Sequence, residues 1–201
     1  MSRDASRMVR GLVFAACACA AACGGAKAGG STTASDEEGA GGGSGGSSGG
    51  AGGGSDIDAK YQGYMSAAGL AISEERTQDA LDAYLAAAAL LDGTGQISIE
   101  RAEAHFLAAD AAYQRVDRDL AISEYQKSVD IYMRFTGNSK IKAAVALTNM
   151  GVMYKEKSDK NKARNCWEEA LQLYKDAPPE LQDQRNMKKI EQNIHDLDNG
   201  F

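Results

Sequence analysis

Proline, histidine and cysteine are scarce in this sequence: its 201 residues include two prolines, two histidines and four cysteines. Because proline interrupts helices, so few prolines permit long helices. His105 and His195 fall on separate predicted helices, with no cysteine or carboxylate at metal-ligand spacing, so we expect no metal and no other cofactor. The sequence also lacks a nucleophile paired with a base and a phosphate loop after a strand, so we do not expect an enzyme.

Positive charge and long apolar runs are scarce too. The chain has 22 Lys and Arg residues against 28 Asp and Glu residues, a net charge of −6, which excludes electrostatic recruitment of nucleic acid. The apolar run at residues 11–22 is shorter than the roughly 20 residues that a bilayer-spanning helix needs. Because it follows Arg3, Arg7 and Arg10, it predicts a secretory signal peptide over residues 1–22.

The end of this run is similar to the lipobox of bacterial lipoproteins, in the stretch Ala20-Ala21-Ala22-Cys23-Gly24. The resemblance implies lipidation of Cys23 and a lipid anchor in the cell envelope. Gly24 after the cysteine implies the outer membrane, with the protein facing the periplasm. Ordinary cleavage after Ala22 and lipidation of Cys17 are the alternatives. With Cys23 lipidated, Cys166 has no partner for an intramolecular disulfide and is expected to be a half-buried structural thiol.

Most of the 23 glycines lie between Gly24 and Gly54. Serine and alanine fill most of the other positions there, and such a composition cannot bury enough apolar area to fold. We therefore predict that residues 23–55 form a flexible tether with an r.m.s. span of about 30 Å. Residues 56–178 then carry the predicted repeats.

A small-large-small triplet recurs three times beyond the tether, about 41–42 residues apart: Ala80, Tyr84 and Ala87; Ala121, Tyr125 and Ser128; Ala163, Trp167 and Ala170. Steps of four and three residues place each triplet on one face of a helix. A fixed period of this length is typical of stacked helical repeats, in which no unit can bury its apolar face alone. We expect the large members of the triplets to pack in the interior.

The breaks in the helical pattern predict three two-helix units at about residues 58–95, 98–137 and 139–178. Asp58, Ser98 and Ser139 are expected to begin their first helices, and Pro178-Pro179 to end the last unit. Residues 179–201 then form a capping helix with one apolar stripe of Met187, Ile190, Ile194 and Leu197.

The third unit resembles the tetratricopeptide repeat, through Leu147, Met150, Gly151 and Tyr154 followed by Ala163, Trp167, Ala170 and Pro178. The first helices of the other two units match less well, with alanines in place of the glycine and tyrosine. The period resembles the long, 42-residue variant typified by kinesin light chains. This resemblance implies an all-α, right-handed α-solenoid of about three repeats with a C-terminal capping helix.

In this family the inner face of the first helices lines a groove that receives a peptide. The corresponding residues here are Met65, Phe106, Leu107, Asp110, Tyr113, Asn149 and Val152. The alternative for Phe106, Leu107 and Val152 is that they pack between neighbouring units. Family members that clamp a chaperone's C-terminal carboxylate carry Lys and Arg in the groove. Met65, Gly69, Leu107 and Val145 occupy those positions here, and of the clamp residues only Asn149 fits, so we expect no such clamp.

The resemblance implies a scaffold or assembly factor that binds another envelope protein. A self-associating structural component, which would be a homo-oligomer, and a non-catalytic subunit of an envelope enzyme are the alternatives. His105 is expected to be buried in the core, and His195 to face solvent on the capping helix.

Overall fold

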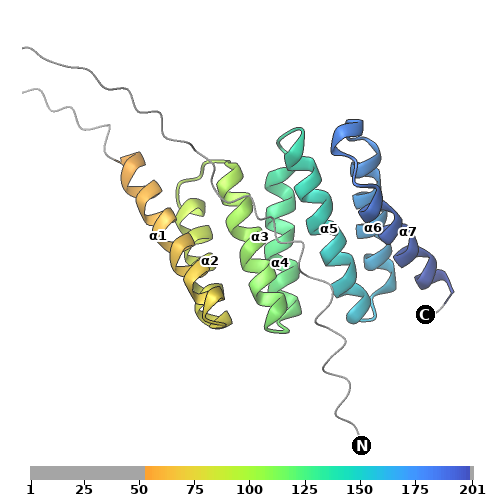
Figure 1. Cartoon of the computed structure of the whole chain (residues 1–201), viewed down its shortest axis with the longest axis horizontal. Coiled ribbons are helices and arrows are strands. Elements are labelled where there is room, and N and C mark those ends of the chain that lie inside the picture. Colours follow the sequence, from red (N-terminus) through yellow and green to blue (C-terminus); the bar gives the residue numbers. More distant parts are fainter. Residues whose placement is uncertain (1–52, 200–201) are drawn as a thin grey trace, which may run out of the picture. The chain divides into compact units, whose positions relative to one another are not determined.

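The structure is a computed structural model that describes residues 53–199 (Figure 1). All regular structure in this range is helical: α1 (Gly53–Ser73), α2 (Thr77–Asp92), α3 (Ile99–Gln114), α4 (Arg118–Tyr132), α5 (Asn138–Glu156), α6 (Lys160–Lys175), the 3₁₀ helix η2 (Pro179–Leu181) and α7 (Gln184–Asp198). The predicted signal peptide, Cys23 and the tether as far as residue 52 lie outside the described residues. None of the described helices combines the length and the apolar character needed to cross a bilayer.

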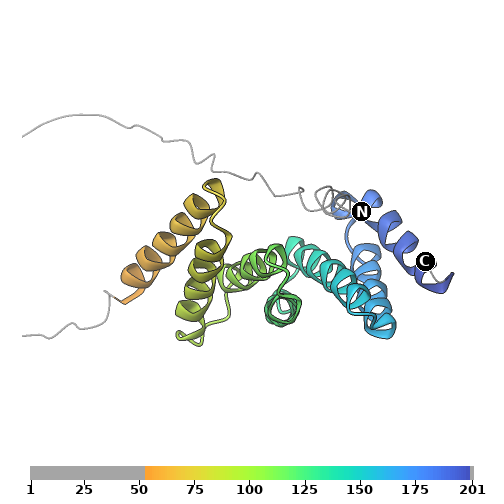
Figure 2. The same cartoon turned by 90° about the horizontal axis from the view of Figure 1, so that it is seen from below.

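Each α-helix packs against the next one along the chain, from α1 to α7, as Figures 1 and 2 show. The second helices of the three hairpins begin at Thr77, Arg118 and Lys160, so the same helix–turn–helix unit recurs through the described part of the chain. This arrangement is an all-α helical repeat solenoid, and it confirms the fold class predicted from the triplets.

Two predicted helix starts are wrong. Helix α1 begins at Gly53, inside the segment assigned to the tether, and Asp56 in its first turn favours the helix because it faces the positive end of the helix dipole. Helix α5 begins at Asn138 after Gly137, whose φ of 63° is easy for glycine. The expected cap, Ser139, instead lies inside the helix and is buried.

Aspartates set the starts of three later helices. Asp117 and Asp159 accept hydrogen bonds of 3.1 Å from the backbone N–H of Leu120 and Lys162, so α4 begins at Arg118 and α6 at Lys160. Asp183 accepts from the backbone N–H groups of the first turn of α7, which follows η2. Ser98 caps α3 as predicted, accepting from the backbone N–H of Arg101 at 3.1 Å.

The core consists mainly of alanines at helix crossings with aromatic rings between them. The rings of Tyr125 and Trp167 are fully buried. The small residues of the triplets are fully buried too, namely Ala80, Ala87, Ala121, Ser128, Ala163 and Ala170. Ser128 donates a hydrogen bond to the Ala102 carbonyl at 2.8 Å, which explains how a serine replaces alanine there. Tyr84 differs from the expectation for the triplets, because it is only half-buried, and Tyr154 on α5 is half-buried as well.

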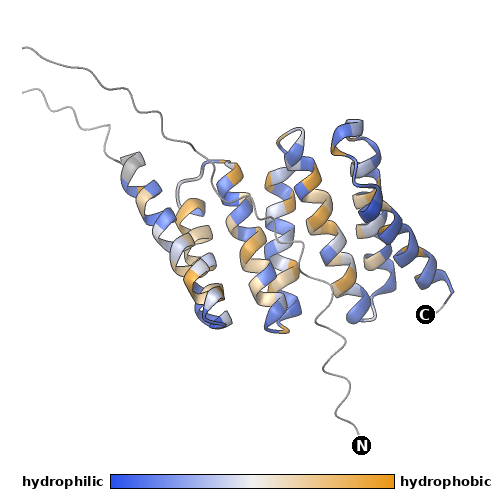
Figure 3. Cartoon of the chain, in the orientation of Figure 1, coloured by the Kyte–Doolittle hydropathy of each residue, from blue (hydrophilic) through white to orange (hydrophobic). Residues whose placement is uncertain are grey.

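The two ends of the solenoid differ in polarity. Helix α7 is largely hydrophilic (Figure 3), and it packs Ile190 and Leu197 inward, with Met187 and Ile194 half-buried, which fits a capping role. Helix α1 instead leaves Leu70 56% and Ile72 41% exposed. The first helix therefore presents apolar surface to solvent at its end of the repeat array.

The turn inside each hairpin contains one residue with positive φ: Glu75, Val116 and Ser158. Valine is the most strained of the three, because its branched Cβ opposes a left-handed backbone, and its side chain is 63% exposed. We expect Val116→Gly to raise the free energy of unfolding by about 1 kcal/mol, as measured by urea unfolding. Val116→Ala keeps the Cβ atom and should gain much less; an equal gain from both variants would show that backbone strain is not the cause.

Candidate functional site

The predicted groove residues lie on the first helix of each hairpin. Met65 is on α1, four of the residues are on α3, and Asn149 and Val152 are on α5. All seven are half-buried: Met65, Phe106, Leu107, Asp110, Tyr113, Asn149 and Val152. Phe106, Tyr113 and Val152 pack against the main core, and Met65 against the smaller cluster around Tyr61. Leu107 packs against neither of these buried clusters. Of the apolar groove candidates, it therefore contributes least to the core.

A chain of polar contacts joins three helices at this face. The Asn149 side-chain amide on α5 donates to the Tyr125 hydroxyl at 2.9 Å, and that hydroxyl donates to the Asp110 carboxylate on α3. The Phe106 ring meets the Tyr125 ring edge-on, with centroids 5.3 Å apart. The structure therefore brings Phe106, Asp110 and Asn149 together around a tyrosine of α4. One N–H of the Asn149 amide is thus bonded within the protein.

The Asp110 carboxyl is largely enclosed, and burial raises its pKa to about 6, although the Tyr125 hydrogen bond acts in the opposite direction. A raised pKa in the folded state means that the ionised carboxylate opposes folding, since the unfolded chain has the ordinary value of 3.8. The contribution of Asp110 to the free energy of unfolding is therefore fully present at acidic pH, and it is lost as the pH rises through about 6.

We expect Asp110→Asn to raise the free energy of unfolding by about 1 to 3 kcal/mol near pH 8, because the amide oxygen still accepts from Tyr125 without carrying charge. The gain should shrink as the pH falls from about 6 towards 4, where the wild-type carboxyl is protonated in the folded state. Urea unfolding at a series of pH values measures it. A constant difference at every pH would contradict a titrating Asp110.

A second link joins the groove face to the hairpin turns. The Tyr113 hydroxyl donates to the Glu156 carboxylate at 3.1 Å, and Arg118 pairs with the same carboxylate at 2.6 Å. Towards the other end of α3, Glu103 pairs with Lys142 of α5 at 3.4 Å. The carboxylates Glu156 and Glu103 on or beside this face are therefore each balanced by a cation.

Sequence reasoning missed a buried charged cluster below this face. His105 Nδ1 lies 2.6 Å from Glu124 Oε2, and both side chains are almost fully buried. His105 Nε2 lies 3.2 Å from Asp92, and Lys127 contacts the second oxygen of Glu124 at 2.7 Å. Burial raises the pKa of Glu124, but the hydrogen bonds from His105 and Lys127 outweigh it and lower the pKa overall. The burial of His105 was predictable, but its partner 19 residues away was not.

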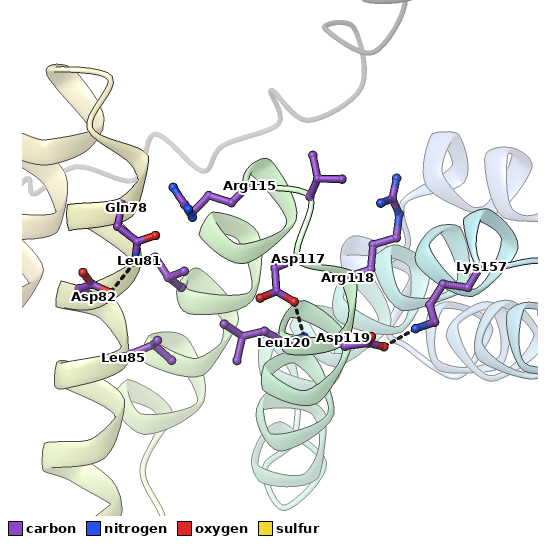
Figure 4. A pocket seen from close by; sticks show the side chains of 11 residues that line it. Gln78, Leu81, Asp82, Leu85, Arg115, Asp117, Arg118, Asp119, Leu120 and Lys157 are labelled. Carbon is purple, nitrogen blue, oxygen red and sulfur yellow. Dashed lines mark hydrogen bonds and ion pairs between the residues drawn. The ribbon is translucent and has the colours of Figure 1, made fainter.

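A hollow lies elsewhere, between α2 and the turn before α4 (Figure 4). It holds about 720 Å³, and Leu81, Leu85 and Leu120 point toward it from both sides. The charged residues at its rim are mostly occupied: Asp119 pairs with Lys157, and Asp117 caps α4. Its lining contains no histidine, serine or cysteine, so it offers no nucleophile–base pair. None of the predicted groove residues lines it.

Metal or thiol chemistry within residues 53–199 would need a metal-binding group or the one cysteine of this range, Cys166. No group of three His, Cys, Asp or Glu side chains in this range is placed to hold a metal ion. The Cys166 thiol is buried, and burial raises its pKa to about 11, which keeps it protonated at neutral pH. His195 is exposed on α7.

Comparison with known proteins identifies the repeat. Residues 100–176, which span α3 to α6, match the tetratricopeptide repeat. The fold is similar to the crystal structure of BtubC (BKLC) from P. vanneervenii, with a TM-score of 0.62 and 20% identity over 71% of this chain. That match spans 56% of the other protein's length. No curated protein matches the sequence.

Tetratricopeptide repeats are typically non-catalytic modules that bind other proteins, and this supports a protein partner. The match covers the second and third predicted units and leaves out α1, α2 and α7. Residues 100–176 thus match the tetratricopeptide repeat family, within a chain whose described part has the fold of a helical repeat protein.

Proposed function

We propose that this protein is a lipid-anchored scaffold of the bacterial envelope, which binds a segment of a partner protein on the face formed by α3 and α5. The observation that carries the proposal is the composition of this face. Six half-buried side chains on α3 and α5 present apolar area beside polar groups, the combination that peptide recognition needs. The tetratricopeptide match over the same helices supports a protein partner.

The anchoring part of the proposal rests on the N-terminal sequence. Cys23 would carry the lipid, and the Gly/Ser-rich stretch after it would let the solenoid move about 30 Å from the membrane. Mass spectrometry of the mature N-terminus tests this. The proposal expects an acylated cysteine at position 23, with the acyl mass lost in Cys23→Ser; an unmodified Cys23 or an N-terminal glycine would reject lipidation there.

The binding part is tested by site-specific photocrosslinking in intact cells that express the full chain. A photoreactive amino acid replaces Leu107, the groove candidate that packs against neither buried cluster. The matched control places it at Ser123, which is exposed on α4. We expect one discrete adduct from position 107 and none from position 123. Equal adducts from both positions, or none from 107, would place partner binding away from this face.

A second candidate function is self-association, favoured by the exposed Leu70 and Ile72 of α1. A photoreactive amino acid in place of Leu70 would then yield an adduct of the chain with itself. Sedimentation of the purified full chain separates the two candidates, since a monomer at every concentration would exclude self-association.

A further inference from the structure

Asp110 is a largely enclosed carboxylate of the α3–α5 face, and no lysine or arginine among the described residues pairs with it. Its neighbours Glu103 and Glu156 are paired with Lys142 and Arg118. Burial raises the pKa of the Asp110 carboxyl, and the hydrogen bond from the Tyr125 hydroxyl lowers it. No lysine, arginine or histidine affects this pKa. The carboxylate therefore holds a negative charge in a largely enclosed position without compensation from residues 53–199.

One oxygen of this carboxylate remains accessible. Tyr125 donates to Oδ1, and no hydrogen bond from the described residues reaches Oδ2. No buried side-chain polar atom in the described part lacks a partner, so Oδ2 must reach the surface. Phe106 and Tyr113 lie one turn before and one turn after Asp110 on α3, so they flank it on the same side of the helix.

The negative charge is not needed for the internal contact. An asparagine would accept the Tyr125 hydrogen bond equally well and would avoid the cost of burying a charge. Folding alone thus favours the amide, and the carboxylate is explained by an interaction that the isolated chain does not make. Burial, and to a smaller extent the charge of Asp110, raises the pKa of the Tyr84 hydroxyl on α2, so the field of Asp110 reaches a third aromatic side chain.

We propose that Asp110 is the specificity-determining residue of the binding face, and that it receives a lysine or arginine side chain of the partner segment. The partner's cation would pair with Oδ2 and lie against the rings of Phe106, Tyr113 and Tyr84, where ring faces add an attraction for cations. This inference rests on the proposed function, because it names the chemistry of the same face. The site is opposite in sign to a clamp for carboxylates.

The probe is a blocked pentapeptide with one arginine among alanines, compared with the same peptide carrying citrulline. Citrulline has almost the same shape and N–H donors but no charge, so the pair separates recognition of charge from recognition of hydrogen-bond donors. Binding to the ¹⁵N-labelled full chain is followed by NMR, with the Asn149 side-chain amide as a local reporter, because Asn149 bonds to Tyr125. We expect the arginine peptide to bind at least about tenfold more tightly than the citrulline peptide.

Two variants test the residue itself. Asp110→Asn keeps the hydrogen bond from Tyr125 and should fold, yet it should abolish the preference for arginine. Asp130→Asn removes the same charge from an exposed position on α4 and should leave the preference unchanged. Equal binding of the two peptides, loss of the preference in Asp130→Asn alone, or the absence of any saturable shift would overturn the inference.

The pH dependence provides an independent readout. Arginine binding should weaken as the pH falls through about 6, where the buried Asp110 carboxyl becomes protonated. Tyr125 on α4 bonds to it, Tyr84 on α2 is affected by its charge, and Tyr113 lies one turn away on α3. The pKa values of these three tyrosines are raised, so they stay neutral in this range. Asn149 faces it from α5 without charge. Binding independent of pH would contradict the assignment.

Failure of this inference differs from failure of the proposed function. An adduct from position 107 in cells without any preference for arginine would retain the binding face and reject the role of Asp110. A clear preference for arginine in solution without an adduct in cells would retain the site and reject the proposed partner.

Discussion

Gly151→Ala is expected to lower the free energy of unfolding by about 3 kcal/mol, a large effect for one added methyl group. A Cβ atom at this position would lie 2.3 Å from Nε1 and 2.5 Å from Cδ1 of Trp167. These distances are far inside van der Waals contact, so either the indole ring or the backbone of α5 must move. Both are held in place by a close-packed interior.

Movement of the indole also costs a hydrogen bond. Trp167 is fully buried, and its Nε1 donates to the Thr148 carbonyl at 3.0 Å. The new methyl group would approach that same nitrogen most closely, so the ring cannot yield without losing its acceptor. Overpacking and a lost hydrogen bond therefore add to each other, and we expect the urea midpoint to fall while the slope of the transition stays the same.

Gly63→Ala is the matched control. It makes the same change inside a helix, but a Cβ atom on Gly63 would have no neighbour within 4 Å. Alanine favours helix more than glycine does, so the control should gain about 0.5 to 1 kcal/mol. Opposite signs for the two variants are the expected result. A loss below about 1 kcal/mol for Gly151→Ala would mean that Trp167 is free to repack.

The contact between Gly151 and Trp167 illustrates what the sequence alone could predict. The small residues and large rings recur at fixed helical spacing, and a pair of antiparallel helices in one hairpin brings them together by local geometry. The repeat, the helix order and most of the buried alanines follow from the same pattern. Ser98 was predictable as a cap because serine before an apolar run has one common local role.

The polar contacts between side chains of different helices were not predictable in this way. The chain from Asn149 through Tyr125 to Asp110 depends on how α3, α4 and α5 cross, which no local pattern fixes. The same holds for His105 and Glu124, whose side chains meet only once α3 and α4 are packed. The start of α1 was missed for a different reason: Gly53 and Gly54 have low helix propensity, and the residues after them decide that the helix extends through them.

The second large effect is expected for His105→Leu, which should lower the free energy of unfolding by about 3 kcal/mol at neutral pH. The substitution keeps the apolar volume but removes the donor 2.6 Å from the buried Glu124 carboxylate. Glu124 is 3% exposed and would keep only Lys127 as a partner. Asp92 is less affected, since Arg101 still contacts it at 2.5 Å. Removing one partner of a buried carboxylate lowers the free energy of unfolding by more than the intact pair contributes to it.

The double variant His105→Leu/Glu124→Leu separates a lost partner from lost packing. With both polar groups replaced by apolar ones of similar size, no uncompensated charge remains, and stability should return to within about 1 kcal/mol of the wild type. If the double variant is instead as unstable as the two single losses added together, the histidine contributes through packing and the charge argument is wrong.

The acid limb of the stability curve provides the final check on this cluster. The hydrogen bonds from His105 lower the pKa values of Glu124 and Asp92 in the folded state, against the effect of burial. Lowered folded-state values mean that the stabilisation is present above the ordinary carboxylate range, and is lost as the pH falls below about 4 through the lowered values. The gap between wild type and His105→Leu in urea unfolding should therefore be widest near neutral pH and should narrow in acid. A gap that widens in acid would show that Glu124 is not the group that His105 stabilises.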